Sequence, residues 1–138
     1  PRVAGSDIEL VVEQGEAPKV RVEVAEAVAA VTNLVMNAID AIDATGARGS
    51  VRIGYGARDG GVVVDVVDTG PGIPADVGER VFEPFFTTKG KLGTGLGLPM
   101  VREFARRHEG NVTLGRSDQG GARFTLWLPP APATLPSR

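Results

Sequence analysis

The chain has no cysteine and a single histidine, His108, among its 138 residues. Without cysteine it forms no disulfide, no thiolate zinc site and no cysteine nucleophile, and one histidine cannot build a histidine-rich metal centre. Acidic and basic residues nearly balance, 17 against 15, so no overall field favours nucleic acid or an anionic membrane. No apolar run approaches the roughly 18 residues that span a bilayer. We therefore expect a globular protein with no nucleic-acid partner and no direct membrane contact.

Glycine and proline are abundant instead, with 19 and 10 residues, against a combined share of roughly 12% in average proteins. Seven of the glycines and four of the prolines lie between Asp68 and Pro99, where regular hydrophobic periodicity stops. Length and composition predict one domain over residues 1–129 and a flexible tail over 130–138. Because the chain begins with Pro1 rather than Met, we expect it to be a piece of something longer.

Hydrophobic periodicity and turn signals predict the order strand, helix, hairpin, irregular segment, helix, hairpin. In the first helix the predicted packing stripe consists of Val24, Val28, Val31, Val35, Ala38 and Ile42. The expected elements are strands at 8–12, 51–55, 62–68, 111–115 and 123–128, with helices at 24–42, about 74–82 and about 99–108. This order indicates an α+β fold, a two-layer sandwich rather than a doubly wound sheet.

Asn33 and Asn37 lie four residues apart on the first predicted helix, on the face opposite that stripe. Asparagine is a mediocre helix former, so two asparagines on one helix face indicate a role other than helix stability. An amide oxygen is a hard ligand that suits Mg²⁺, which usually takes one or two protein ligands beside phosphates. The alternative interpretation is an ordinary solvated polar face.

Asp68 ends a valine-rich predicted strand and is followed by Thr-Gly-Pro-Gly-Ile. In the strand's alternation, its carboxylate projects at the end of the apolar row of Val62, Val64 and Val66. A carboxylate in such a place needs a partner, and an exocyclic amine such as that of adenine could donate to it. The glycines would let a flat ring approach the backbone. The alternative is an aspartate that caps a turn.

Two further segments flank the start of the last predicted helix. Gly-Thr-Gly-Leu-Gly-Leu at 93–98 could form an anion site at the helix N-terminus, although its spacing fits neither the Rossmann nor the Walker pattern. Before it, residues 81–89 gather three of the five phenylalanines beside Lys89. That segment is either a local hydrophobic plug or a hinge whose lysine reaches a terminal phosphate.

In this order and spacing, the segments resemble the ATP-binding catalytic domain of sensor histidine kinases. That domain shares the Bergerat fold of the GHKL superfamily with gyrase, the ninety-kilodalton heat-shock chaperones and mismatch-repair ATPases. NLVMNAIDA resembles the N box, DTGPGIP the first glycine box, VFEPFFTTK the F box, GTGLGLPMV the second glycine box and GGARFTLWLP the closing strand. The FFTTK segment is most similar to that of the nitrogen-regulation type of histidine kinase. The resemblance spans residues 8–129 and implies a mixed, mostly antiparallel sheet covered on one face by about three helices.

The resemblance implies ATP and Mg²⁺ as ligands and assigns roles to individual positions. Asn37 would ligate the metal, and Asn33 would face the phosphates. Lys89 would lie near the γ-phosphate, so that Asn33 and Lys89 are the candidate catalytic residues. Asp68 would bind the adenine amine, with a hydroxyl from Thr125 near the base. The other implied nucleotide-binding positions are Gly70, Gly72, Ile73, Phe86, Thr87, Thr88, Gly93, Thr94, Gly95, Leu96, Gly97 and Leu98.

The sequence departs from the ATP-hydrolysing members, which resemble it but carry a glutamate at the place of Asn33. An amide cannot act as a general base near neutral pH. The resemblance therefore implies that the γ-phosphoryl group passes to a histidine on a separate helical dimerisation domain of the same protein, and onward to a response regulator. His108 lacks the family's H-box context, so we expect a structural role for it and a phosphoacceptor outside this sequence.

Two other functions stay open on the sequence alone. A serine kinase of the anti-sigma type uses the same sandwich, and a degenerate domain could sense nucleotide without phosphoryl transfer. A gyrase-like ATPase is disfavoured by Asn33. The histidine kinase interpretation also implies a cytoplasmic domain that is monomeric in isolation, in a parent protein that is either soluble or membrane-anchored.

Overall fold

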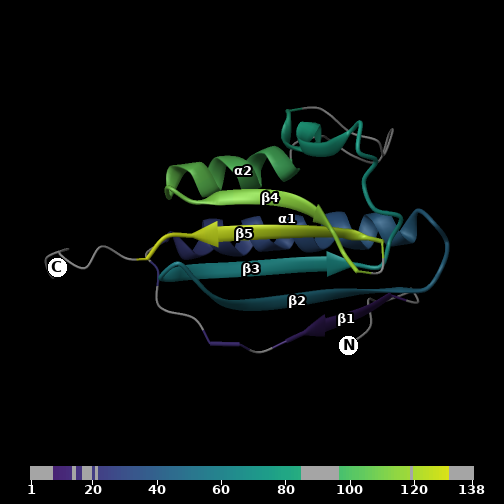
Figure 1. The fold of residues 1–138 in the computed structure, drawn as a ribbon, viewed down its shortest axis with the longest axis horizontal. Coiled ribbons are helices and arrows are strands. Elements are labelled where there is room, and N and C mark those ends of the chain that lie inside the picture. The colour runs from purple at the N-terminus through teal and green to yellow at the C-terminus, as the bar shows by residue number, and fades with distance from the viewer. Residues whose placement is uncertain are drawn as a thin grey trace, which may run out of the picture.

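A computed structural model describes residues 8–13, 15–16, 20, 22–84, 97–118 and 120–130. In chain order its elements are β1 (Ile8–Val12), α1 (Val24–Asp43), β2 (Gly49–Arg58), β3 (Gly61–Asp68), the 3₁₀-helix η1 (Gly78–Phe82), α2 (Gly97–Arg107), β4 (Asn111–Arg116) and β5 (Ala122–Leu128). The predicted element order is confirmed (Figure 1). Most of the predicted tail lies outside the described residues, so the boundary at 129/130 stays a prediction.

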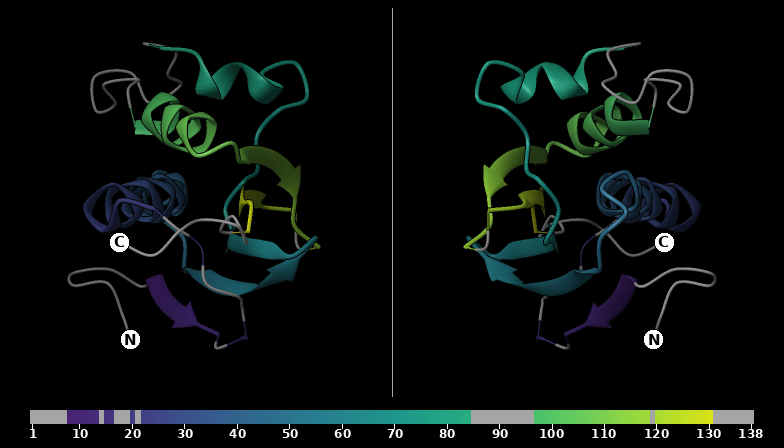
Figure 2. Two further views of the ribbon diagram at one scale, coloured as in Figure 1. Left: turned by 90° about the vertical axis from the view of Figure 1, so that its left-hand side faces the viewer. Right: turned by 90° about the vertical axis from the view of Figure 1, so that its right-hand side faces the viewer.

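The sheet has five strands in the order β1-β2-β3-β5-β4. β1 runs parallel to β2, and the other neighbouring pairs are antiparallel. Both α-helices lie on the same side of the sheet, and no helix of the described residues covers its other face, called the open face below (Figure 2). This arrangement confirms the predicted two-layer α+β sandwich with a mixed, mostly antiparallel sheet.

Residues with positive φ determine the path of the chain at the β2–β3 turn and at η1. Asp59 and Gly60, between β2 and β3, have φ of 51° and 78°, as a two-residue Asp-Gly hairpin turn requires. The helix expected at 74–82 is shorter and is only 3₁₀, over Gly78–Phe82. Gly78 has φ of 49°, which an α-helix cannot contain, so the chain turns once after Pro74 before the 3₁₀-helix begins.

The buried row of α1 differs from the predicted stripe. It consists of Ala30, Leu34, Ala38 and Ile42, each at most 3% exposed. Val24 and Val28 were predicted to pack but are 71% and 60% exposed, so that part of the stripe was wrong. Hydropathy favours valine over alanine, whereas close packing of a helix on a sheet favours small side chains at alternate turns of the contact.

By length and composition alone, α1 could cross a membrane, with 20 residues and a mean hydropathy of 1.3. A core helix of a domain passes the same test, and α1 packs in the sandwich with Leu34 and Ala38 fully buried. The contact of α1 with the rest of the sandwich therefore explains its buried apolar row of Ala30, Leu34, Ala38 and Ile42.

An ion cluster joins the end of α2 to the beginning of α1. Arg107 donates to both carboxylate oxygens of Glu26, at 2.9 and 3.0 Å. His108 packs its ring against Phe104, with centroids 4.8 Å apart, and its Nε2 lies 3.8 Å from Glu26 Oε1. This packing is what the expected structural role of His108 requires.

Candidate functional site

Asp68 is the most deeply buried charged residue that the structure describes, with 1% of its surface exposed. It ends β3 on the same side as the fully buried Val66, as the alternation predicted. Its Oδ1 accepts hydrogen bonds from the N–H of Gly70 at 2.9 Å and the N–H of Ala122 at 3.2 Å. Its Oδ2 is buried and has no hydrogen-bond partner among the described residues.

This environment shifts the acid toward its protonated form. Burial raises the pKa of Asp68, and the two backbone N–H groups offset that shift only in part. Buried polar atoms nearly always have a partner, so an unpartnered oxygen calls for an explanation. A ligand that brings an N–H donor to Oδ2 would supply the missing hydrogen bond.

The glycine-rich loop after Asp68 packs tightly against the protein's own backbone. Gly72 has φ of 78°, and a Cβ there would lie 2.5 Å from the carbonyl oxygen of Gly120. A Cβ on Gly70 would lie 3.1 Å from Asp68 Oδ1. Ile73 packs against the core. Larger residues at 70 and 72 would therefore push this loop away from the end of β3.

Asn33 and Asn37 are both partly buried on α1. They were predicted to lie opposite the buried row. Instead both lie to one side of it, at about 120° and 80° from its centre for 100° per residue. α2 begins next to Asn33, since a Cβ on Gly97 would lie 3.4 Å from Asn33 Oδ1. The structure thus brings Asn33 together with the N-terminus of α2, and Leu98 there packs against the core.

Eight of the predicted site residues lie outside the described residues. They are Phe86, Thr87, Thr88, Lys89, Gly93, Thr94, Gly95 and Leu96. Their roles stay predictions.

The prediction that places Thr125 near the base is wrong. Thr125 pairs across the sheet with Asp65 and donates its hydroxyl to Asp65 Oδ1 at 2.6 Å. On β5 the buried Phe124 and Leu126 point to the helix-covered side, so Thr125 must face the open side, away from the Asp68 carboxylate. The sequence showed this alternation, but the register that pairs Thr125 with Asp65 is a long-range feature.

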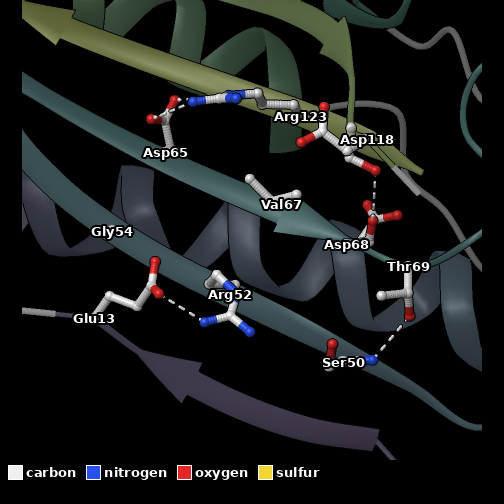
Figure 3. Close-up of a pocket in the computed structure, with 11 residues that line it drawn as sticks. Glu13, Ser50, Arg52, Gly54, Asp65, Val67, Asp68, Thr69, Asp118 and Arg123 are labelled. Atoms are coloured by element: carbon white, nitrogen blue, oxygen red, sulfur yellow. Dashed lines mark hydrogen bonds and ion pairs between the residues drawn. The ribbon is translucent and has the colours of Figure 1, made fainter. Parts of the chain in front are cut away.

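A polar hollow lies on the open face of the sheet (Figure 3). Arg52 pairs there with Glu13 at 2.7 Å, and Arg123 pairs with Asp65 at 3.0 Å. Burial raises the pKa of Asp65, but the hydrogen bonds from Arg123 and Thr125 outweigh it, and the pKa is lowered overall. These paired charges form a structural network, and the hollow extends to the end of β3, where Asp68 and Ser117 also line it.

Sequence reasoning missed two residues beside Asp68. Ala122 contributes only its backbone N–H, which no side-chain pattern reveals. Ser117 is 8% exposed, and its hydroxyl donates to the carbonyl oxygen of Asp68 at 3.4 Å. The available signal was the Gly120-Gly121 pair just after this serine, which marks a tight turn at the end of the predicted hairpin.

The sandwich and the buried acid beside a glycine loop define a two-layer α+β ligand-binding domain. Residues 23–132 match the family described as histidine kinase-, DNA gyrase B- and HSP90-like ATPase. The chain belongs to that family, and the predicted resemblance is confirmed.

Relatives at the sequence level are sensor kinases. The sensor histidine kinase ZraS of Escherichia coli O157:H7 is 44% identical over 97 residues, which cover 70% of this chain and 20% of ZraS. The nitrogen regulation protein NtrY of Azorhizobium caulinodans is 39% identical over 104 residues, 72% of this chain and 13% of NtrY. The chain thus spans about a fifth or less of the length of these relatives.

Solved structures of histidine kinases have a fold similar to that of this chain. The catalytic domain of histidine kinase ThkA has a TM-score of 0.77 and 32% identity, covering 91% of this chain and 82% of that one. Full-length ShkA in complex with AMPPNP has a TM-score of 0.78 and 31% identity, covering 95% of this chain and 27% of ShkA. The fold is that of a histidine kinase catalytic domain.

The opposite pKa shifts of Asp68 and Asp65 predict opposite pH dependences of stability. The raised pKa of Asp68 favours the folded state at low pH, and this contribution is lost as pH rises through the folded pKa. The free energy of unfolding of wild type minus that of Asp68→Asn should fall as pH rises above about 4, by at most about 1.4 kcal/mol per pH unit.

Asp65→Asn is the matched control on the same strand. Its lowered pKa stabilises the folded state above the unfolded pKa, so the wild-type advantage should disappear as pH falls below about 4. Urea unfolding of the three proteins across this pH range measures both differences. If both differences in the free energy of unfolding changed with pH in the same direction, the raised pKa of Asp68 and the lowered pKa of Asp65 would not both be correct.

Proposed function

We propose that this domain binds Mg-ATP and donates the γ-phosphoryl group to a histidine on a separate helical dimerisation domain. The observation that carries the proposal is the buried Oδ2 of Asp68, which has no partner among the described residues. An ionised carboxylate is an acceptor only, so the group that completes it must be a donor. The exocyclic amine of adenine is such a donor, and the related ShkA was solved with AMPPNP.

The loop and the start of α2 would hold the rest of the nucleotide. Gly70, Gly72 and Ile73 follow Asp68 directly and would line the base. Gly97 and Leu98 begin α2, where free N–H groups and the helix dipole favour phosphate. Since α2 begins beside Asn33, the phosphates would lie between α1 and α2.

The donor set of α1 fits Mg²⁺. Asn37 and Asn33 are partly buried amides one turn apart on α1, and Asn33 lies beside the start of α2. Amide oxygens are hard ligands, and Mg²⁺ takes few protein ligands when phosphates are present. We assign Asn37 to the metal, which when bound would neutralise phosphate charge. Asn33 cannot activate water, so the site would retain ATP until another nucleophile arrives.

The acceptor of the phosphoryl group would lie on another domain. His108 follows the last residue of α2, while the phosphates would lie at its first residue, Gly97. At 1.5 Å per residue, the 11 residues of α2 separate the two ends by about 16 Å. His108 is therefore too far away to attack the γ-phosphorus in line. A response regulator would take the group next, and such a domain would work in the cytoplasm.

Nucleotide binding by Asp68 is tested with two aspartates of the same strand. Asp68→Ala should lower the Mg-ATP affinity of the chain at least about tenfold, because a hydrogen bond to a charged acceptor is lost. Asp65→Ala, on the opposite face, should leave the affinity within about twofold of wild type. Isothermal titration calorimetry measures all three proteins. Normal binding by Asp68→Ala, or no wild-type binding at millimolar ATP, would contradict the proposal.

Phosphoryl transfer is tested by the chemistry of its product. The chain is mixed with labelled Mg-ATP and a separately produced helical histidine domain from ZraS, with its histidine replaced by alanine in a control. We expect acid-labile, base-stable label on the histidine domain and none on the control. Acid-stable label on a serine would favour a serine kinase instead. Nucleotide binding without transfer to any cognate helical domain would favour a regulatory module.

A further inference from the structure

Ser117 and Asp68 are the two buried polar residues that the structure describes. They are 49 residues apart in the chain, yet the hydroxyl of Ser117 lies 3.4 Å from the carbonyl oxygen of Asp68 and can donate to it. The same hydroxyl accepts a hydrogen bond from the N–H of Gly121 at 2.9 Å. One side chain therefore bridges the end of β3 and the beginning of β5.

The turn between β4 and β5 is closed by the backbone of the same serine. The N–H of Ser117 donates to the carbonyl oxygen of Gly121 at 2.7 Å, and the N–H of Gly120 donates to the carbonyl oxygen of Ser117 at 3.0 Å. A Cβ on Gly121 would lie 2.0 Å from the carbonyl oxygen of Asp68. The turn is thus pressed against the end of β3 with no space for a side chain at 121.

The turn also determines which oxygen of Asp68 is free. Ala122 follows Gly121 directly, and its N–H donates to Asp68 Oδ1. Because Gly121 is held by Ser117, the direction of the Ala122 N–H depends on the serine hydroxyl. If the turn moved away, Oδ1 would lose one of its two donors, and the carboxylate could rotate away from its present orientation.

We propose that Ser117 is a positioning residue of the nucleotide site, which orients the Asp68 carboxylate so that Oδ2 is presented to the amine of adenine. This inference rests on the proposed function, because it assigns Oδ2 to an amine donor. Ser117 acts through the β4–β5 turn and does not itself touch the nucleotide. Its contribution should therefore appear in how the site distinguishes bases, rather than in how tightly it holds phosphates.

The test compares two nucleotides on the full 138-residue chain. Mg-ATP and the Mg²⁺ complex of purine riboside triphosphate differ only in the exocyclic amine. Wild type should prefer ATP at least about tenfold, as expected for a hydrogen bond to a charged acceptor. Ser117→Ala should reduce this preference to about twofold or threefold, with the affinity for the amine-free nucleotide unchanged. Calorimetry gives both affinities, and thermal unfolding shows that each variant is folded.

Ser50→Ala is the matched control. Ser50 lies at the neighbouring strand end, and the hydrogen bonds described for it are made by its backbone, to Thr69. It should keep the wild-type preference. If Ser117→Ala does not fold, Ser117→Cys keeps the size of the side chain with a much weaker hydrogen-bonding group, and the same loss of preference is expected.

The outcomes separate the two proposals. Equal weakening of both nucleotides by the Ser117 variants would make the serine merely structural and overturn the inference. An unchanged preference would also overturn it, while leaving the assignment of Asp68 intact. A wild-type protein that binds Mg-ATP without preferring it would instead show that Oδ2 does not accept the amine, which overturns this inference together with the assignment of Asp68 to adenine and leaves Mg-ATP binding itself intact.

Discussion

The uncompensated oxygen of Asp68 is the feature on which the rest of the site depends. Burying a carboxylate is costly, and this fold reduces the cost with two backbone N–H groups on Oδ1 while leaving Oδ2 without a described partner. One donor comes from the glycine loop after β3 and the other from the start of β5. The loop and the β4–β5 turn therefore have to lie where they do for this acid to remain in the core.

The two aspartates of β3 lie on opposite faces of the sheet and have opposite pKa shifts. Asp65 faces the open side, where Arg123 and Thr125 satisfy it and lower its pKa. Asp68, three residues later, faces the helix-covered side, where burial raises its pKa. An acid whose hydrogen bonds are all made stabilises the fold. A buried acid that lacks one hydrogen bond destabilises it, and a ligand that donates this bond would offset the loss.

The element order and the place of Asp68 could be predicted because both depend on local patterns. Alternation along β3 put Asp68 at the end of an apolar row, and Asp59-Gly60 identified the hairpin turn. Thr125 was misplaced because its partner is set by the register between β3 and β5. Ala122 and Ser117 were missed since they act through backbone groups and a contact across 49 residues, neither of which hydropathy or motif spacing records.

The central claim is that the Asp68 carboxylate awaits an amine donor, and its own titration tests this most directly. Carbon-detected NMR can follow the side-chain carboxyl of Asp68 against pH, with and without saturating Mg-ATP. We predict a pKa above the ordinary aspartate value in the free domain, and a lower pKa in the complex, because the amine stabilises the ionised form. A pKa that is ordinary in the free domain, or that nucleotide leaves unchanged, would contradict the account.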